Sequence, residues 1–138
     1  MAELRHRLDR SVPGDMSPTD KLRHVFRLSR EDGVTPSRQK LNDMLAGRRP
    51  VPAEARATLR ELEARAELQD ALSEAWSRFR ASVFWSVSRE FVLEPAHAMA
   101  VADELRHGSL DAFRQGARIR RLHEALVKAK EGERDAVA

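Results

Sequence analysis

Residues 33–49 read GVTPSRQKLNDMLAGRR, a short helix with a start signal, a stop signal and two arginines beyond it. Thr35 is a candidate N-cap, and Pro36 is tolerated in the first turn because its missing N–H would be unpaired there anyway. Gly47 supplies the left-handed residue that commonly ends a helix. The sequence therefore predicts a helix over residues 36–46.

This predicted helix has one narrow apolar face. At 100° per residue, Leu41, Met44 and Leu45 share a side, and Gln39 and Asp43 lie opposite them. Such a helix packs through a single stripe and offers hydrogen-bonding side chains to the outside. A helix that lies in the DNA major groove needs this distribution.

The polar face carries the side-chain types that recognise base edges. Gln39 and Asn42 match the N6/N7 edge of adenine, Arg38 or Lys40 matches the O6/N7 edge of guanine, and Asp43 can accept from cytosine N4. We expect these five residues to contact DNA bases. On shape alone, the same helix is more typical of the surface of a helical bundle, and the Gly-Arg-Arg-Pro exit and the order of the helices favour DNA binding.

Two arginines follow the helix directly, and their predicted role is different. Arg48 and Arg49 lie where they would meet phosphates, which adds affinity without sequence information. Residues 1–56 hold twelve Lys and Arg against eight Asp and Glu, whereas residues 57–138 hold thirteen against fourteen. Positive charge is therefore concentrated in the half that contains the predicted reading helix.

Length and composition limit the possible classes of protein. A chain of 138 residues forms one domain, or one small domain with a helical extension. The absence of cysteine excludes disulfides and thiolate zinc sites, and no apolar run approaches a membrane span or a signal-peptide core. We expect a cytoplasmic, nucleoid-associated protein, and the Ala/Arg/Glu/Leu-rich composition is typical of a high-GC bacterium.

Helix start and stop signals recur along the chain and strand signals do not, so the predicted fold class is all-α. We expect a first helix over residues 2–10 and a second that Ser17 caps and Pro18 opens. Neither Gly nor Pro interrupts residues 53–94, which predicts one long helix, or two with a bend near residues 64–68. Further helices follow Pro95 and Ser109.

The order of these elements resembles the Cro/C1-type (xenobiotic-response-element) helix-turn-helix regulators, most closely those of the mycobacterial secretion-regulator and nucleoid-associated type. The resemblance rests on AELRHRLD at residues 2–9, SPTD at 17–20, GVTPS at 33–37, Leu41, Gly47, Arg49 and the Pro-led helix after it. Where that family usually carries Gln, near the start of the second helix, this chain has Thr19 or Asp20. The resemblance implies a helix-turn-helix DNA-binding domain over residues 1–66.

Residues 67–138 carry no such resemblance, and we expect them to form a helical dimerisation or partner-binding region. Five of the seven aromatic residues lie between 76 and 91, on a predicted helix that is apolar on more than one side. In so small a domain this pattern predicts a homodimer interface made by Trp76, Phe79, Val83, Phe84, Trp85, Val87 and Phe91. Two alternatives stay open, since the chain's own helices can wrap this segment, or the surface can hold a ligand.

No catalytic or metal-binding pattern is present in the sequence. The five histidines show no His-x-x-x-His spacing, and there is no Gly-rich phosphate loop and no nucleophile–base pattern. We therefore expect neither an enzyme nor a cofactor. The predicted function is a dimeric, sequence-specific DNA-binding transcription regulator; the alternatives are a protein-interaction adaptor and an antitoxin that uses the aromatic half.

Overall fold

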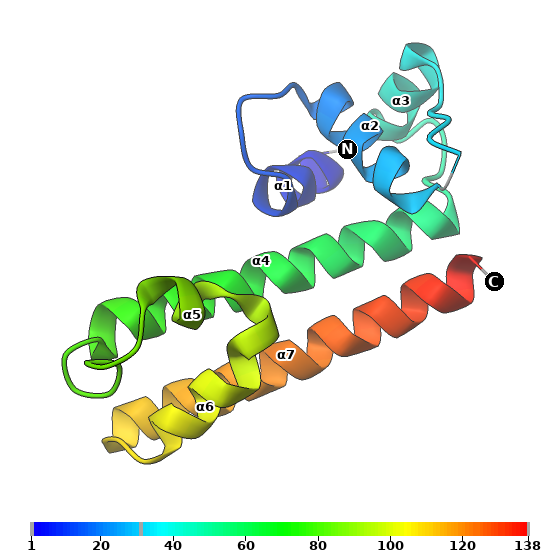
Figure 1. The fold of residues 1–138 in the computed structure, drawn as a ribbon. Helices are drawn as coiled ribbons and strands as arrows, with labels where there is room; N and C mark the ends of the chain where they lie inside the picture. Colours follow the sequence, from blue (N-terminus) through cyan, green and yellow to red (C-terminus); the bar gives the residue numbers. More distant parts are fainter. Residues whose placement is uncertain (1, 31, 138) are drawn as a thin grey trace. The chain divides into compact units, whose positions relative to one another are not determined.

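A computed structural model describes residues 2–30 and 32–137, and every regular element within these ranges is helical. The elements are α1 (Ala2–Ser11), α2 (Pro18–Ser29), α3 (Arg38–Leu45), α4 (Ala53–Phe79), α5 (Arg89–Leu93), the 3-10 helix η1 (Pro95–His97), α6 (Ala98–Arg106) and α7 (Leu110–Val137) (Figure 1). The predicted all-α class is confirmed. Among the described residues, no helix combines the length and the apolar character needed to cross a bilayer.

The chain divides into two compact units. The N-terminal unit comprises the described residues of 1–63 and 129–138, and the C-terminal unit comprises residues 64–128. The chain crosses between the units inside α7, after residue 128, and also inside α4, three residues before the boundary expected after residue 66. Neither Gly nor Pro marks the crossing in α4, so the sequence shows no linker at this point.

The core of the N-terminal unit joins α1, α2, α3 and the first turns of α4. Its buried members are Leu8, Val12, Leu22, Val25, Phe26, Leu41, Met44, Leu45, Ala55 and Leu59. Two ion pairs also join these helices. Arg7 of α1 pairs with Glu63 of α4, and the buried Lys21 ammonium of α2 lies 3.0 Å from the Asp9 carboxylate of α1. A buried ammonium needs such a partner, because its desolvation is otherwise costly.

The predicted starts of α2 and α3 have different outcomes. Ser17 caps α2 as predicted, and its hydroxyl accepts from the Asp20 N–H at 3.2 Å. Helix α3 begins two residues later than predicted, because Ser37 rather than Thr35 is its N-cap and accepts from the Lys40 N–H at 3.3 Å. Serine is the better capping residue of the two, so the helix starts behind it.

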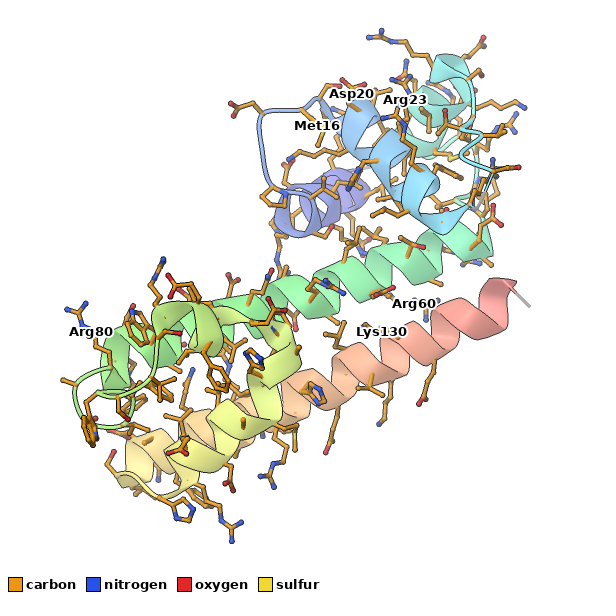
Figure 2. All side chains as sticks on the ribbon, viewed as in Figure 1. Met16, Asp20, Arg23, Arg60, Arg80 and Lys130 are labelled. Carbon is orange, nitrogen blue, oxygen red and sulfur yellow. The ribbon has the colours of Figure 1, made fainter. Side chains whose placement is uncertain are left out.

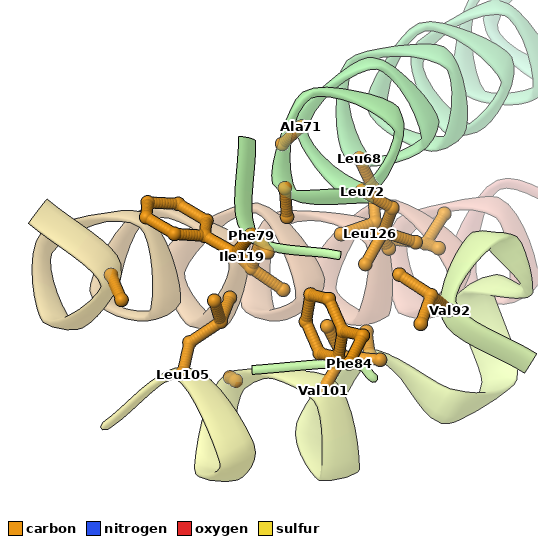
Figure 3. Close-up of a cluster of buried hydrophobic side chains, with 14 residues drawn as sticks. Leu68, Ala71, Leu72, Phe79, Phe84, Val92, Val101, Leu105, Ile119 and Leu126 are labelled. Carbon is orange, nitrogen blue, oxygen red and sulfur yellow. The ribbon is translucent and has the colours of Figure 1, made fainter. Parts of the chain in front are cut away.

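The core of the C-terminal unit is built from α4, α5, α6 and α7. Figure 3 shows large side chains from all four helices meeting there, among them Leu72, Val92, Leu105 and Ile119. Gln115 is the polar exception within this core, and its side-chain amide donates to the Ala71 carbonyl at 2.9 Å. That hydrogen bond satisfies a buried polar group and joins α7 to α4.

The predicted continuation of the long helix to residue 94 is wrong, because α4 ends at Phe79. The Phe79 carbonyl there accepts from the N–H groups of Val83 and Phe84, at 2.8 and 3.2 Å. In a continued helix Phe84 would lie 140° around the axis from Phe79. The turn instead brings Phe84 back into the same core, where its ring lies 6.4 Å from that of Trp76.

This turn also changes the predicted dimer interface. Phe79 and Phe84 are buried inside the chain's own core, and Trp76, Val83 and Val87 are half-buried against it. Phe79 and Phe84 therefore do not face a partner subunit as predicted, because the chain's own helices cover them. Trp76, Val83 and Val87 keep part of their surface, and their place at an interface stays a prediction. Of the seven expected interface residues, Trp85 and Phe91 are exposed, at 79% and 37%.

Candidate nucleic-acid interface

Helix α3 packs through one face, as its sequence pattern predicts. Leu41, Met44 and Leu45 are buried in the core of the N-terminal unit. The opposite side carries polar and cationic side chains, and those of Arg38, Gln39, Lys40 and Asn42 are exposed. The amphipathic pattern therefore places four of the five expected base-contacting residues in solvent.

Three exposed side chains come from the first turn of α3. Within the described part of the chain, the side chains of Arg38, Gln39 and Lys40 have neither a hydrogen-bond nor an ion-pair partner. All their donors, and the Gln39 carbonyl, can therefore meet a ligand without breaking an internal bond.

Asn42 differs from these three because another helix holds it. The Thr19 hydroxyl, in the first turn of α2, donates to Asn42 Oδ1 at 2.8 Å. This bond directs the carbonyl of Asn42 toward α2 and leaves its amide nitrogen as an available donor. Sequence reasoning missed Thr19, because the two residues are 23 positions apart and meet only when α2 packs on α3.

The turn after α3 is a complete Schellman motif. Gly47 has φ +80°, its N–H donates to the Met44 carbonyl at 3.1 Å, and the Arg48 N–H donates to the Asp43 carbonyl at 2.8 Å. Both bonds satisfy carbonyls that the end of the helix leaves free. The predicted role of Gly47 is confirmed.

The same turn brings the Arg48 side chain back onto α3. Its Nε and Nη2 atoms donate to Asp43 Oδ1, at 3.1 and 3.0 Å. The two residues were expected to contact phosphate and cytosine separately, whereas the structure pairs them with each other. Arg49, the next residue, is exposed and has no ion-pair partner among the described residues.

Two further features describe the surroundings of α3, and the first departs from the helix-turn-helix that the resemblance implies. The connection between α2 and α3 runs from Arg30 to Ser37, longer than the three- to four-residue turn of a compact helix-turn-helix. Arg23 on α2 is not a free cation, because it donates to the Asp20 carboxylate at 2.9 Å (Figure 2).

We define the α3 surface as Arg38, Gln39, Lys40, Asn42, Asp43, Arg48 and Arg49. Its electrostatic balance is cationic: the Asp43–Arg48 pair is neutral, and Arg38, Lys40 and Arg49 remain unpaired. Chemically, the surface can attract a polyanion and can exchange hydrogen bonds with planar acceptor edges. In the described ranges, no three His, Asp or Glu side chains gather as a metal site.

No family model matches the chain, and no curated protein or solved structure was found to be similar to it. The resemblance of residues 1–66 to Cro/C1-type regulators therefore stays a prediction.

Proposed function

We propose that this protein is a sequence-specific DNA-binding transcription regulator that acts as a dimer and inserts α3 into the major groove. The observation that carries the proposal is the first turn of α3, where Arg38, Gln39 and Lys40 are exposed and unpaired. In helix-turn-helix proteins the first residues of the reading helix contact the base edges.

The side chains of the α3 surface take different roles in this proposal. Gln39 reads adenine through N6 and N7, and Arg38 or Lys40 reads guanine through O6 and N7. Asn42, held by Thr19, offers its amide nitrogen to an acceptor on a neighbouring base. Arg49 binds a phosphate and contributes affinity for any sequence.

A dimer fits this function because two copies can occupy two half-sites about 34 Å apart on the DNA. Support comes from the apolar side chains that the C-terminal unit leaves exposed. Trp85 and Phe91 were expected at the interface and remain exposed. Exposed apolar surface of this kind is available to a second copy of the chain.

Gel-shift titrations at two salt concentrations, with Gln39→Ala and Arg49→Ala, test the assignment of roles. Gln39→Ala is expected to lower discrimination at one base pair by about 1–3 kcal/mol. Arg49→Ala is expected to weaken binding to all sequences alike and to reduce the salt slope by about one unit. Identical behaviour of the two variants would contradict this assignment.

The competing function is a protein-interaction adaptor that uses the exposed Trp85. The specific observation in its favour is the 79% exposure of this large apolar side chain. If the unaltered protein does not bind DNA at either salt concentration, the adaptor is favoured.

A further inference from the structure

Helices α6 and α7 approach each other closely in the C-terminal unit. A Cβ atom placed on Gly116 would lie 2.9 Å from the Ala102 carbonyl oxygen and 3.2 Å from Leu105 Cβ. The residues at this contact are small, whereas longer side chains of α6 and α7 flank them. The small residues therefore form the floor of a trough between the two helices.

This trough is a cleft of about 510 Å³. Ala102, Gly116 and Ala117 are the small residues of its lining, and the Phe113 side chain, which is 48% exposed, adds an aromatic surface. Clefts of about 300–1,000 Å³ with a mainly apolar lining and a few polar groups are typical of small-molecule sites.

The polar groups of the cleft are mostly cationic. Arg106 comes from α6, and Arg120 and Arg121 come from α7. None of the three has an ion-pair partner among the described residues, whereas Arg118 of the same helix pairs with Glu74 at 2.8 Å. With Glu124 as its acid, the lining carries a net charge of +2 and is complementary to an anion.

We propose that this cleft binds a small amphipathic carboxylate, a molecule with an apolar body and one terminal carboxylate group. Phe113 and Arg120 are seven residues apart on α7, which places them about 10 Å apart along the helix axis. An extended apolar body spans this distance over the small-residue floor. Its carboxylate meets the guanidinium groups of Arg120 and Arg121, which suit carboxylates because their donors form a planar fork.

The chemistry of the lining favours this class of ligand over a polyanion. Glu124 repels a second negative charge, and the apolar floor gives a phosphate chain no hydrogen-bond donors. An apolar body, by contrast, gains free energy by covering Ala117 and the Phe113 ring.

Isothermal titration of the full chain with decanoate, below its micelle concentration, tests the proposal. Decanol and inorganic phosphate serve as probes that lack the charge or the apolar body. We expect saturable binding of decanoate, at least about tenfold tighter than that of either probe. Equal binding of decanol or of phosphate, or no binding of decanoate, would overturn the proposal.

Two variants with changes in the cleft and one control variant outside it test whether decanoate binds in the cleft. The double variant Arg120→Glu/Arg121→Glu removes the cationic group, and Ala117→Trp fills the floor; each is expected to weaken decanoate binding about tenfold or more. Arg114→Glu changes one charge at an exposed α7 residue outside the cleft and should leave binding unchanged. Circular dichroism melts confirm that each variant is folded.

If decanoate binds the unaltered protein but none of the folded variants weakens it, the site is elsewhere and the proposal is wrong. The titration requires no DNA. Its failure would therefore leave the proposed DNA-binding function untouched, and loss of DNA binding would leave the ligand site untouched.

Discussion

At the scale of single residues, the carboxylate of Asp43 lowers the positive charge of the α3 surface. A carboxylate on a surface that meets DNA repels phosphates, and Arg48 neutralises it by donating twice to Oδ1. An exposed pair of this kind contributes little to stability. Its consequence is electrostatic, because it withdraws one arginine from the set of free cations.

Replacement of Asp43 by Asn is expected to strengthen DNA binding. The substitution removes one negative charge and frees Arg48 for a phosphate, so affinity rises for all sequences and the salt slope steepens by about 0.9 units. Gel shifts at several salt concentrations measure both effects. Asp103→Asn, which makes the same charge change in the C-terminal unit, is the control, and an equal effect of the two substitutions would contradict the prediction.

Substitutions of Ser37 and Thr35 test where α3 begins. Ser37→Ala is expected to lower the free energy of unfolding by about 1 kcal/mol, because it removes the hydroxyl that accepts from Lys40. Thr35→Ala should change it by less than about 0.5 kcal/mol. Urea titrations measure both values. A larger loss for Thr35→Ala would show that α3 begins earlier than the structure places it.

At the scale of elements, α7 contains two glycines in different surroundings. A Cβ on Gly116 would meet the Ala102 backbone at 2.9 Å, whereas nothing lies within 4 Å of a Cβ on Gly132. Helix propensity favours alanine over glycine at both positions, so tertiary packing decides the difference between them.

The paired substitutions Gly116→Ala and Gly132→Ala separate these two effects. Gly116→Ala is expected to lower the free energy of unfolding by about 1–3 kcal/mol, because α6 must shift away from α7. Gly132→Ala is expected to raise it by up to about 1 kcal/mol. Denaturant unfolding of both variants is the measurement. If Gly116→Ala also stabilises the protein, α6 and α7 do not approach as closely as the structure indicates.

At the scale of the whole molecule, we expect polyanion binding to depend more on where the charges lie than on the net charge. The chain has a formal net charge of only +3, yet residues 1–56 alone carry twelve Lys and Arg against eight Asp and Glu. If the α3 surface attracts a polyanion, the position of a charge must decide its effect on binding.

Heparin chromatography tests this prediction with two double variants of equal charge change. Arg48→Glu/Arg49→Glu is expected to elute at clearly lower salt than the unaltered protein. Arg89→Glu/Arg114→Glu, at exposed positions of the C-terminal unit, should elute close to it. Circular dichroism checks that the Schellman turn tolerates the first pair. Equal shifts of the two variants would mean that net charge alone governs retention, which favours the adaptor.

The sequence by itself determined the all-α class, the Ser17 cap, the Gly47 stop and the buried face of α3. These features depend on residues within a few positions of one another, so local propensity and periodicity are sufficient to predict them. The exposure of Arg38, Gln39 and Lys40 follows from the same periodicity.

Only the tertiary structure decided the end of α4 at Phe79, the bond from Thr19 to Asn42 and the trough beside Gly116. Each depends on residues from different elements. The turn at Phe79 has no Gly or Pro to mark it, and it places Phe84 in the core, where burial of its ring is favourable. The free energy that places these features comes from packing between segments distant in the chain, which no local pattern records.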